Sequence, residues 1–163
     1  MNDSQLIWEA YQQNYLRPDV LWHGSTEPNL TVIEPRQAKD ISGEPSQNKF
    51  AVYATADRNV AIALTLGERG ANHGINHNID NKLVSFDNPP RLRTGKQGYL
   101  YKLPVDTFET KFKPTRNPEW TSDVPVKPID VEVINVDDYI PTHVRPPTEA
   151  DIHMFNNPTQ YEG

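Results

Sequence analysis

Fifteen prolines are spread along the 163 residues of this chain, from Pro18 to Pro158. Average proteins contain about 5% proline, so this chain has nearly twice the usual share. Proline has no backbone N–H and breaks the interior of helices and central strands, so the chain must fold as short elements joined by loops. A bundle of long helices is disfavoured, and the length predicts a single domain with a short tail.

Composition removes several further classes of protein. The chain contains no cysteine, which excludes a disulfide framework, a thiolate nucleophile and a cysteine-ligated zinc site. Its five histidines never fall in the spacing of a zinc protease, and we predict no bound metal. No apolar run approaches the roughly 20 residues of a membrane span, and the first residues do not resemble a signal peptide. We therefore expect a cytoplasmic protein without a membrane partner.

The charge is unevenly distributed along the chain. Sixteen basic and 22 acidic residues give a net charge of −6, which disfavours non-specific nucleic-acid binding by the whole surface. Residues 91–116 nevertheless carry seven basic and two acidic side chains. This segment is interpreted either as a solvated basic face or as an anion site.

Apolar patterns predict the secondary structure. Alternating and β-branched residues predict strands at 20–23, 30–33, 50–55, 83–86, 98–103, 108–112, 120–121 and 124–136. Spacing of three to four residues predicts helices over 3–15, from the N-cap Asp57 to Gly67, and after a capping box at residues 148–151. Residues 36–48 and 67–82 have loop composition, and the second segment is expected to be mobile, without a packed element.

Runs of strands without regular alternation of strand and helix predict an α+β fold of mostly antiparallel sheets with two or three peripheral helices. We expect residues 1–146 to form one domain that begins with the helix over 3–15. Residues 147–163 are expected to form a short helix and a frayed tail.

Three places could carry chemistry. In His23-Gly24-Ser25 an imidazole ends a strand beside a glycine that exposes its backbone. Tyr53-Ala54-Thr55 ends a strand just before the start of a helix, where backbone N–H groups favour an anion or a carboxamide. Glu119 precedes Trp120 at the mouth of a strand. Taken singly, these residues fit a structural histidine, a core tyrosine and a solvated carboxylate better than they fit a site.

Taken in order, the three places resemble the His-Tyr-Glu signature of the ADP-ribosyltransferase superfamily. Leu21-Trp22-His23-Gly24-Ser25 resembles its first motif, and residues 50–57 with the following helix resemble its second. Glu119-Trp120, followed by residues 125–128, is similar to the third, and residues 117–126 also resemble small bacterial rifamycin-modifying ADP-ribosyltransferases. The resemblance spans about residues 20–136 and implies a split β-sandwich of two sheets.

The resemblance also implies roles in a reaction of NAD. His23 would donate to the adenosine-side ribose hydroxyls, the Gly24 backbone would pair with the nicotinamide carboxamide, and Tyr53 would stack on the nicotinamide ring. Ser25, Ala54 and Thr55 would complete the NAD-binding set. Glu119 would be catalytic, because a carboxylate near the ribose stabilises the positive charge that develops when the nicotinamide bond breaks. Arg36 and Arg58 are candidates for binding the pyrophosphate.

Departures from the family pattern limit what the resemblance implies. Arginine-modifying members carry Glu or Gln where this chain has Asn117, so the acceptor stays open between a protein, a nucleic-acid end and a small molecule. Polymerising members carry a second stacking tyrosine in the helix after the tyrosine motif, where this chain has Ile62, Ala63 and Leu64. The pattern therefore implies mono-transfer.

Other functions stay open from the sequence. One is a catalytically inactive module of the same fold that binds a nucleotide or a partner. Another is an RNA 2′-phosphotransferase-like or nucleic-acid-binding protein that uses residues 91–116. His73 and His77 are four residues apart, but Gly74 and the surrounding asparagines disfavour the helix that would let both hold a metal. The oligomeric state cannot be read from the sequence.

Overall fold

The computed structural model of the chain describes residues 17–37, 50–77, 79–110 and 119–156. The expected helix over 3–15 and Asn117 lie outside these residues. The strands are β1 (Leu21–Ser25), β2 (Arg36–Gln37), β3 (Phe50–Thr55), β4 (His73–Ile75), β5 (Leu83–Ser85), β6 (Gln97–Leu103), β7 (Glu119–Ser122), β8 (Asp130–Asn135) and β9 (Val144–Arg145). The helices are α2 (Arg58–Ala63), α3 (Val136–His143) and α4 (Glu149–Asn156).

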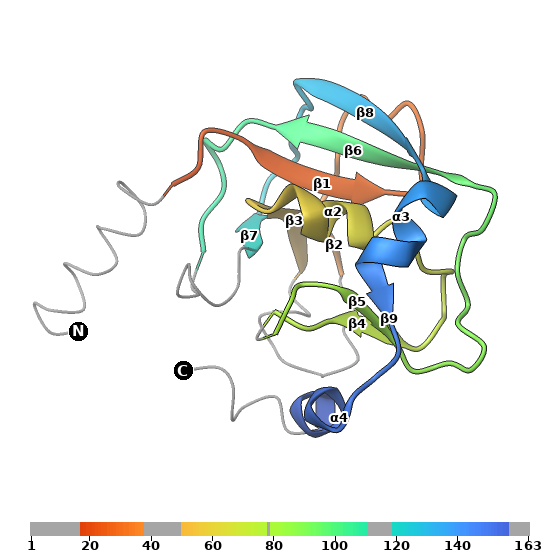
Figure 1. The fold of residues 1–163 in the computed structure, drawn as a ribbon. Coiled ribbons are helices and arrows are strands. Elements are labelled where there is room, and N and C mark those ends of the chain that lie inside the picture. The colour runs from red at the N-terminus through yellow and green to blue at the C-terminus, as the bar shows by residue number, and fades with distance from the viewer. Residues whose placement is uncertain (1–16, 38–49, 78, 111–118, 157–163) are drawn as a thin grey trace, which may run out of the picture.

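Two sheets organise these elements (Figure 1). The larger has the order β2-β3-β1-β6-β8, with β7 also paired to β3, and all of its pairs are antiparallel. The smaller has the order β4-β5-β9, in which β5 and β9 are parallel. The predicted α+β class with mostly antiparallel sheets is confirmed for the described residues.

The side chains of the larger sheet pack on both of its faces. One face holds a core cluster that includes Leu21, Tyr101 and Trp120. The other face packs against α2, where Ala61 and Ile62 contact Leu100 and the half-buried Trp22. Strand alternation sends neighbouring residues such as Leu21 and Trp22 to opposite faces, so one short sequence serves both layers. In Figure 1, α2 lies directly against β1.

Local capping sets the starts of two helices. The predicted N-cap Asp57 accepts a hydrogen bond from the Asn59 N–H, so α2 begins at the predicted place, although it ends at Ala63 and not at Gly67. At α4, the Thr148 N–H donates to the Asp151 carboxylate, and the Asp151 N–H donates to the Thr148 hydroxyl. This reciprocal pair confirms the predicted capping box.

Several predicted elements are wrong. Residues 30–33 form no strand and contribute one bridge, Ile33 to Val126. The prolines on both sides of Val126 lack the N–H groups that would extend this ladder. The described part of 108–112 is likewise reduced to a bridge between Glu109 and Thr121.

The predicted long strand over 124–136 is also divided. Its strand β8 begins only at Asp130, and Val136 already starts α3. Helix α3 was not predicted, because its apolar residues continue directly from the strand pattern and Pro141 lies inside it. Asp137 and Asp138 in its first turn favour a helix start there.

The expectation that residues 67–82 hold no packed element is wrong. His73–Ile75 form β4 and pair with β5, and the side chain of Asn76 is fully buried. Residues 36 and 37, expected in a loop, form β2. In both cases a polar segment is held by partners outside the segment. The composition of the segment alone does not identify these partners.

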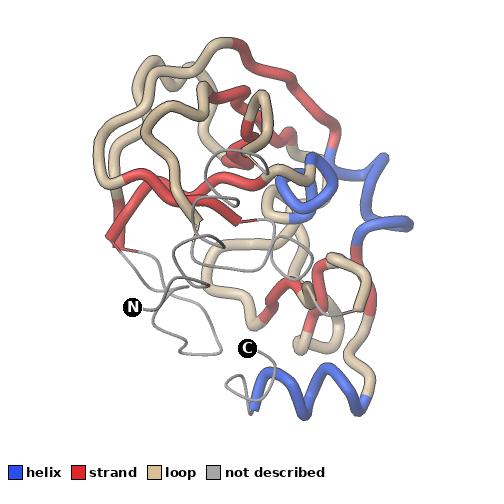
Figure 2. Tube along the Cα trace, turned by 90° about the vertical axis from the view of Figure 1, so that its left-hand side faces the viewer, coloured by secondary structure: helices blue, strands red, loops and turns tan. Residues whose placement is uncertain are grey.

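Helix α4 lies at the far end of the molecule from the larger sheet in both views (Figures 1 and 2). None of the helices described is long and apolar enough to cross a membrane.

Candidate functional site

The three motif strands are neighbours in the larger sheet. Strand β3 pairs with β1 at Trp22 and Thr55, and with β7 from Val52–Ser122 to Thr55–Glu119. Tyr53 and Thr55 are two residues apart, and Thr55 is directly opposite Glu119, so all three side chains leave the same face of the sheet. Tyr53 and Glu119 are diagonal neighbours, which places their Cα atoms about 7–8 Å apart.

Hydrogen bonds to backbone groups hold Glu119 and its strand in position. The Thr110 hydroxyl donates to the Glu119 carbonyl over 2.9 Å, and Glu109 and Thr121 exchange backbone hydrogen bonds. The following residue, Trp120, is buried in the core cluster. These contacts hold the strand and leave the Glu119 residue half-buried.

Arg17 supports the same strand, and sequence reasoning missed it. Its guanidinium lies 5.3 Å from the centre of the Trp120 ring and donates to the carbonyls of Val105 and Phe108. The arginine therefore holds the connection after β6 against the strand that carries Glu119. Its position before Pro18, outside any motif, gave no sequence signal of this role.

The larger sheet opens between β1 and β3 at His23. Strand β1 pairs with β6 over five residues, but its described register with β3 consists of Trp22 and Thr55. Beyond that pair, the His23 ring reaches the Tyr53 carbonyl, with Nδ1 and the oxygen 2.6 Å apart. A side chain thus bridges the two strands at the point where their ladder stops, and this brings the first two motifs together.

His23 does not share the face of Tyr53 and Glu119. Its register partner on β6 is Tyr101, whose ring lies in the core cluster, whereas Trp22 packs on the α2 side. The imidazole therefore lies at the opening between the strands and not over the surface from which Glu119 projects. The structure brings the three motif strands together but separates their side chains into two sets.

The hydrogen bond to Tyr53 fixes the tautomer of His23. A carbonyl can only accept, so Nδ1 must carry the hydrogen. Burial lowers the pKa of His23; the bond to Tyr53 opposes this effect, and the charge of Arg36 adds to it. The neutral ring then has an unprotonated Nε2, which no described residue engages. His23 thus offers a ligand hydroxyl an acceptor, rather than the donor that the resemblance implies.

Gly24 and Ser25 have structural roles in addition to any binding role. A Cβ on Gly24 would lie 2.1 Å from the Ala61 carbonyl oxygen of α2, so only glycine lets β1 lie this close to the helix. The Ser25 hydroxyl accepts a hydrogen bond from the Glu27 N–H and shapes the turn that follows β1.

Ala54 and Thr55 also support the structure around the site. Ala54 belongs to the core cluster. Thr55 is buried, and its hydroxyl accepts from the Asp57 N–H over 3.0 Å, which sets the turn from β3 into α2. Both residues were predicted to bind NAD. Their structural contacts account for both residues even in the absence of a ligand.

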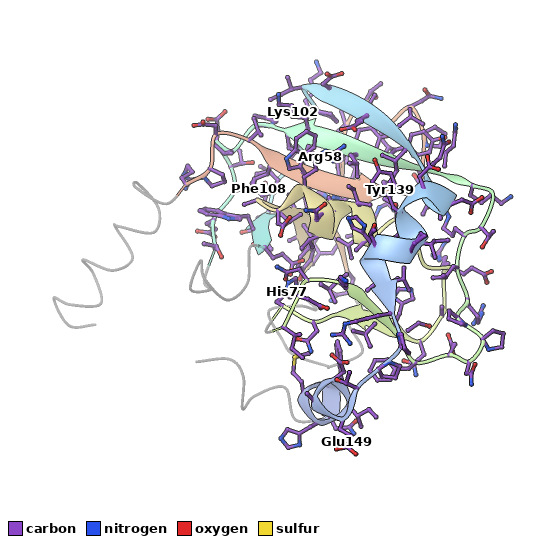
Figure 3. All side chains as sticks on the ribbon, in the orientation of Figure 1. Arg58, His77, Lys102, Phe108, Tyr139 and Glu149 are labelled. Carbon is purple, nitrogen blue, oxygen red and sulfur yellow. The ribbon has the colours of Figure 1, made fainter. Side chains whose placement is uncertain are left out.

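The two candidate pyrophosphate ligands differ in their surroundings. Arg58 forms an ion pair with Glu132 of β8 and lies over the Trp22 ring, in the region where α2 and α3 meet the sheet (Figure 3). Its hydrogen bond with Glu132 raises its pKa. Arg36 lies on β2, opposite Ala51 of β3, and is largely exposed. Both arginines form an ion pair, but the pair of Arg36 with Glu27 is the looser and more exposed of the two.

A separate groove of about 640 Å³ begins at Thr26, next to the end of β1. Its lining includes the aromatic Tyr99 and charged residues of both signs: Arg93, Lys96, Asp137 and Asp138. Arg93 donates to the carbonyls of Thr65 and Gln97, so it supports the fold. The lining contains none of the predicted site residues.

The remaining polar candidates have structural partners. The His77 ring contacts the Asn81 side chain, and the His73 ring lies against Gly67. In the described part of the chain, no group of three or more potential ligands could hold a metal ion.

Comparison with known proteins identifies no relative of this chain. The chain matches no family model, no curated protein and no solved structure. The site is therefore characterised by its own geometry.

Proposed function

We propose that the protein is an NAD-dependent mono-ADP-ribosyltransferase with the split β-sandwich fold of that superfamily. The observation that carries the proposal is the adjacency of the three motif strands, β1, β3 and β7, in one sheet. These motifs are separated by about 30 and 65 residues in sequence, and each resembled the family only weakly by itself. A helix directly follows the tyrosine strand, as the family resemblance also requires.

The reaction needs an aromatic group and a carboxylate on one surface. Tyr53 and Glu119 project from the same face of the sheet, close enough for a single nicotinamide riboside to contact both. The Tyr53 ring would hold the nicotinamide by stacking and so orient the leaving group.

Glu119 would act on the bond that breaks. As the nicotinamide nitrogen leaves with the electron pair of the glycosidic bond, positive charge develops on the ribose. A fixed carboxylate beside that ribose stabilises the transition state more than the ground state. The backbone contacts of Thr110 and Glu109 keep the strand, and hence this carboxylate, in place.

The experiment measures by chromatography the rate at which the wild type and Glu119→Gln release nicotinamide from NAD. We expect the variant to lose about a hundredfold or more in rate, because its side chain keeps its size but loses its charge. The matched control is Glu109→Gln, which changes a carboxylate on the neighbouring backbone bridge and should keep most of the activity.

The outcomes separate the proposal from its rivals. Equal rates for the wild type and Glu119→Gln would remove Glu119 from the mechanism. Saturable NAD binding by the wild type without nicotinamide release would show an inactive binding module instead. Mass analysis of a lysate incubated with the enzyme and labelled NAD would then identify the acceptor of an active enzyme.

A further inference from the structure

Strand β8 forms an open edge of the larger sheet. It is the last strand in the order β2-β3-β1-β6-β8, and β6 is its only partner among the described strands. Figure 1 shows it at the upper border of the sheet, next to β6. An open edge presents a row of unpaired N–H and C=O groups, which is a template for a further strand.

The register with β6 determines which backbone groups of β8 face outward. The Val136 N–H, directly after the strand, donates to the Lys96 carbonyl in the register of the ladder. Because hydrogen-bonded and non-hydrogen-bonded pairs alternate in an antiparallel ladder, the even-numbered residues of β8 bond to β6. The N–H and C=O groups of Val131 and Val133 therefore point away from the sheet. In agreement with this direction, the Val131 N–H donates to the Asp130 carboxylate.

The same two residues carry exposed apolar side chains. Val131 is 44% exposed and Val133 is 53% exposed. They are two residues apart, so both side chains leave one face of the sheet, where their register partners are Tyr101 and Tyr99. Proteins usually protect an open edge with charged residues, prolines or bulges. An edge with alternating exposed valines therefore indicates a surface that a partner covers.

A second copy of the chain supplies a matching strand. If two β8 strands pair antiparallel about a two-fold axis at Glu132, Val131 of each copy lies opposite Val133 of the other, and their outward backbone groups exchange hydrogen bonds. An axis at Val131 would instead place Asp130 opposite Glu132 twice, and like charges directly opposite are destabilising. An axis at Val133 would leave a single valine pair and place Val131 opposite Asn135.

The charges on the other face of the sheet fit the axis at Glu132. The two Glu132 side chains would meet there, and each forms an ion pair with Arg58 of its own α2. Neither side chain is buried, since Arg58 is 38% exposed and Glu132 is 44% exposed. Each guanidinium is then within reach of both carboxylates, so two arginines and two glutamates neutralise one another across the axis.

We propose that β8 is a dimer interface and that it joins the larger sheets of two copies into one continuous sheet about a two-fold axis at Glu132. The valine pairs cover one face of the junction, and the arginine–glutamate pairs cover the other. Asp130 opposes the association, because the Val131 N–H must leave its carboxylate before it can donate to the second copy. Dimer formation through β8 needs no NAD and is independent of nicotinamide release.

Sedimentation equilibrium of the full chain over a range of concentrations measures the association. We expect a monomer–dimer equilibrium for the wild type. Val133→Lys should weaken the dimer by about tenfold or more, because the symmetric interface loses both valine pairs and gains two charges. The matched control is Val124→Lys, which makes the same charge change at a valine that is 47% exposed and lies outside β8. It should leave the dimer unchanged, and thermal melting checks that each variant is folded.

The role of Asp130 gives a change in the opposite direction. Asp130→Ala should strengthen the dimer by about twofold to fivefold, because it frees the Val131 N–H for the second copy. Glu149→Ala removes the same charge from an exposed position on α4 and should have no effect. Equal dimer strength in the wild type and Asp130→Ala would exclude this competition.

A cysteine at the axis tests the register. The chain has no cysteine, so a disulfide in Glu132→Cys must join two copies. Opposite residues of a non-hydrogen-bonded pair have Cα atoms about 4.5 Å apart, which suits a disulfide. Glu132→Cys should therefore oxidise to a covalent dimer on a non-reducing gel. Glu68→Cys is the control and should form it much more slowly, since Glu68 also pairs with an arginine and its side chain is 47% exposed.

Three results would overturn this interface. A wild type that stays monomeric at every concentration, or a dimer that Val133→Lys leaves unchanged, would exclude β8 as the contact. Equal oxidation of Glu132→Cys and Glu68→Cys would exclude the axis at Glu132. If a monomeric wild type binds a fluorescent peptide of alternating valine and threonine and Val133→Lys does not, the edge takes a foreign strand and not a second copy.

Discussion

Two polar clusters in this protein differ in how completely their hydrogen-bonding groups are used. At the base of α4, the fully buried Asp151 carboxylate accepts from Arg145, Asn76 and Thr148. At the opening between β1 and β3, the His23 Nε2 has no described partner and Arg36 has only the loose contact with Glu27. We call these the closed cluster and the open cluster.

The difference shows what each cluster is for. Arg145 also donates to Asp80 near β4, so the closed cluster ties α4, the loop after β4 and β9 together. A buried charge left without a partner is strongly destabilising, so such a cluster must be fully satisfied. The open cluster leaves donors and acceptors free for a ligand. A polar cluster that is complete without a ligand indicates a structural role.

The largest expected effect comes from the closed cluster. Asp151→Asn should lower the free energy of unfolding by about 3 kcal/mol, because it removes one charge of a buried ion pair. Urea denaturation measures this loss. Glu149→Gln, an exposed change in the first turn of the same helix (Figure 3), should cost less than about 0.5 kcal/mol. Equal losses in the two variants would contradict the assignment of the closed cluster.

The closed cluster also predicts a dependence on acid. Burial alone raises the pKa of Asp151, but hydrogen bonds from Arg145, Thr148 and Asn76 outweigh it and hold the pKa well below the usual 3.8. Its contribution is therefore complete above pH 3.8 and is lost as the pH falls toward the folded pKa. Acid unfolding below pH 4 should consequently show a smaller pH dependence in Asp151→Asn than in the wild type.

A smaller effect is expected where β1 meets α2. Gly24→Ala should lower the free energy of unfolding by about 2 kcal/mol, since the new methyl group collides with the Ala61 carbonyl. The shift of β1 should also reduce the rate of nicotinamide release. In Gly70→Ala, the methyl group meets open space and only the positive φ opposes it, so the loss should be about 1 kcal/mol without an effect on the rate. The reverse order of the two losses would be inconsistent with this packing.

The smallest effect concerns the protonation of His23. Because its folded pKa is below the usual 6.5, protons bind more readily to the unfolded chain as the pH falls below 6.5. The free energy of unfolding should then decrease by about 1 kcal/mol per pH unit until the folded pKa is reached.

His23→Gln should remove much of this dependence, because its amide can still donate to the Tyr53 carbonyl but does not titrate. His143 also has a pKa lowered by burial and should contribute its own share of this dependence, so the control is a change at the exposed His153 of α4, His153→Gln. A pH profile unchanged in His23→Gln would mean that the imidazole titrates normally, and the assignment of a neutral ring with an acceptor Nε2 would lose its support.

The sequence predicted those features that depend on neighbouring residues. Asp57 and Thr148 act as caps where the pattern places them, because a cap and its partner are two or three residues apart. Strands β3, β5 and β6 follow their alternating residues closely. Helix α3 was missed, since its start at Val136 continues the apolar pattern of the preceding strand.

The candidate site was predicted only in part. The motifs identified the strands that carry His23, Tyr53 and Glu119, but local patterns contain no information on which strands pair. Glu27, Arg17 and Tyr101 were not singled out at all. Arg17 and Tyr101 contact residues that are 71 to 91 positions away in the sequence. No short sequence pattern marks such contacts.

The sequence by itself determined the class of fold, the short elements between prolines, the helix caps and the absence of thiol chemistry, because each follows from local backbone and side-chain properties. Tertiary structure decided that β1, β3 and β7 are neighbours, that the sheet opens at His23, and that Arg36 pairs with Glu27 while Arg58 pairs with Glu132. Those outcomes depend on long-range pairing and burial, which determine the hydrogen-bonding groups and charges that a ligand can contact.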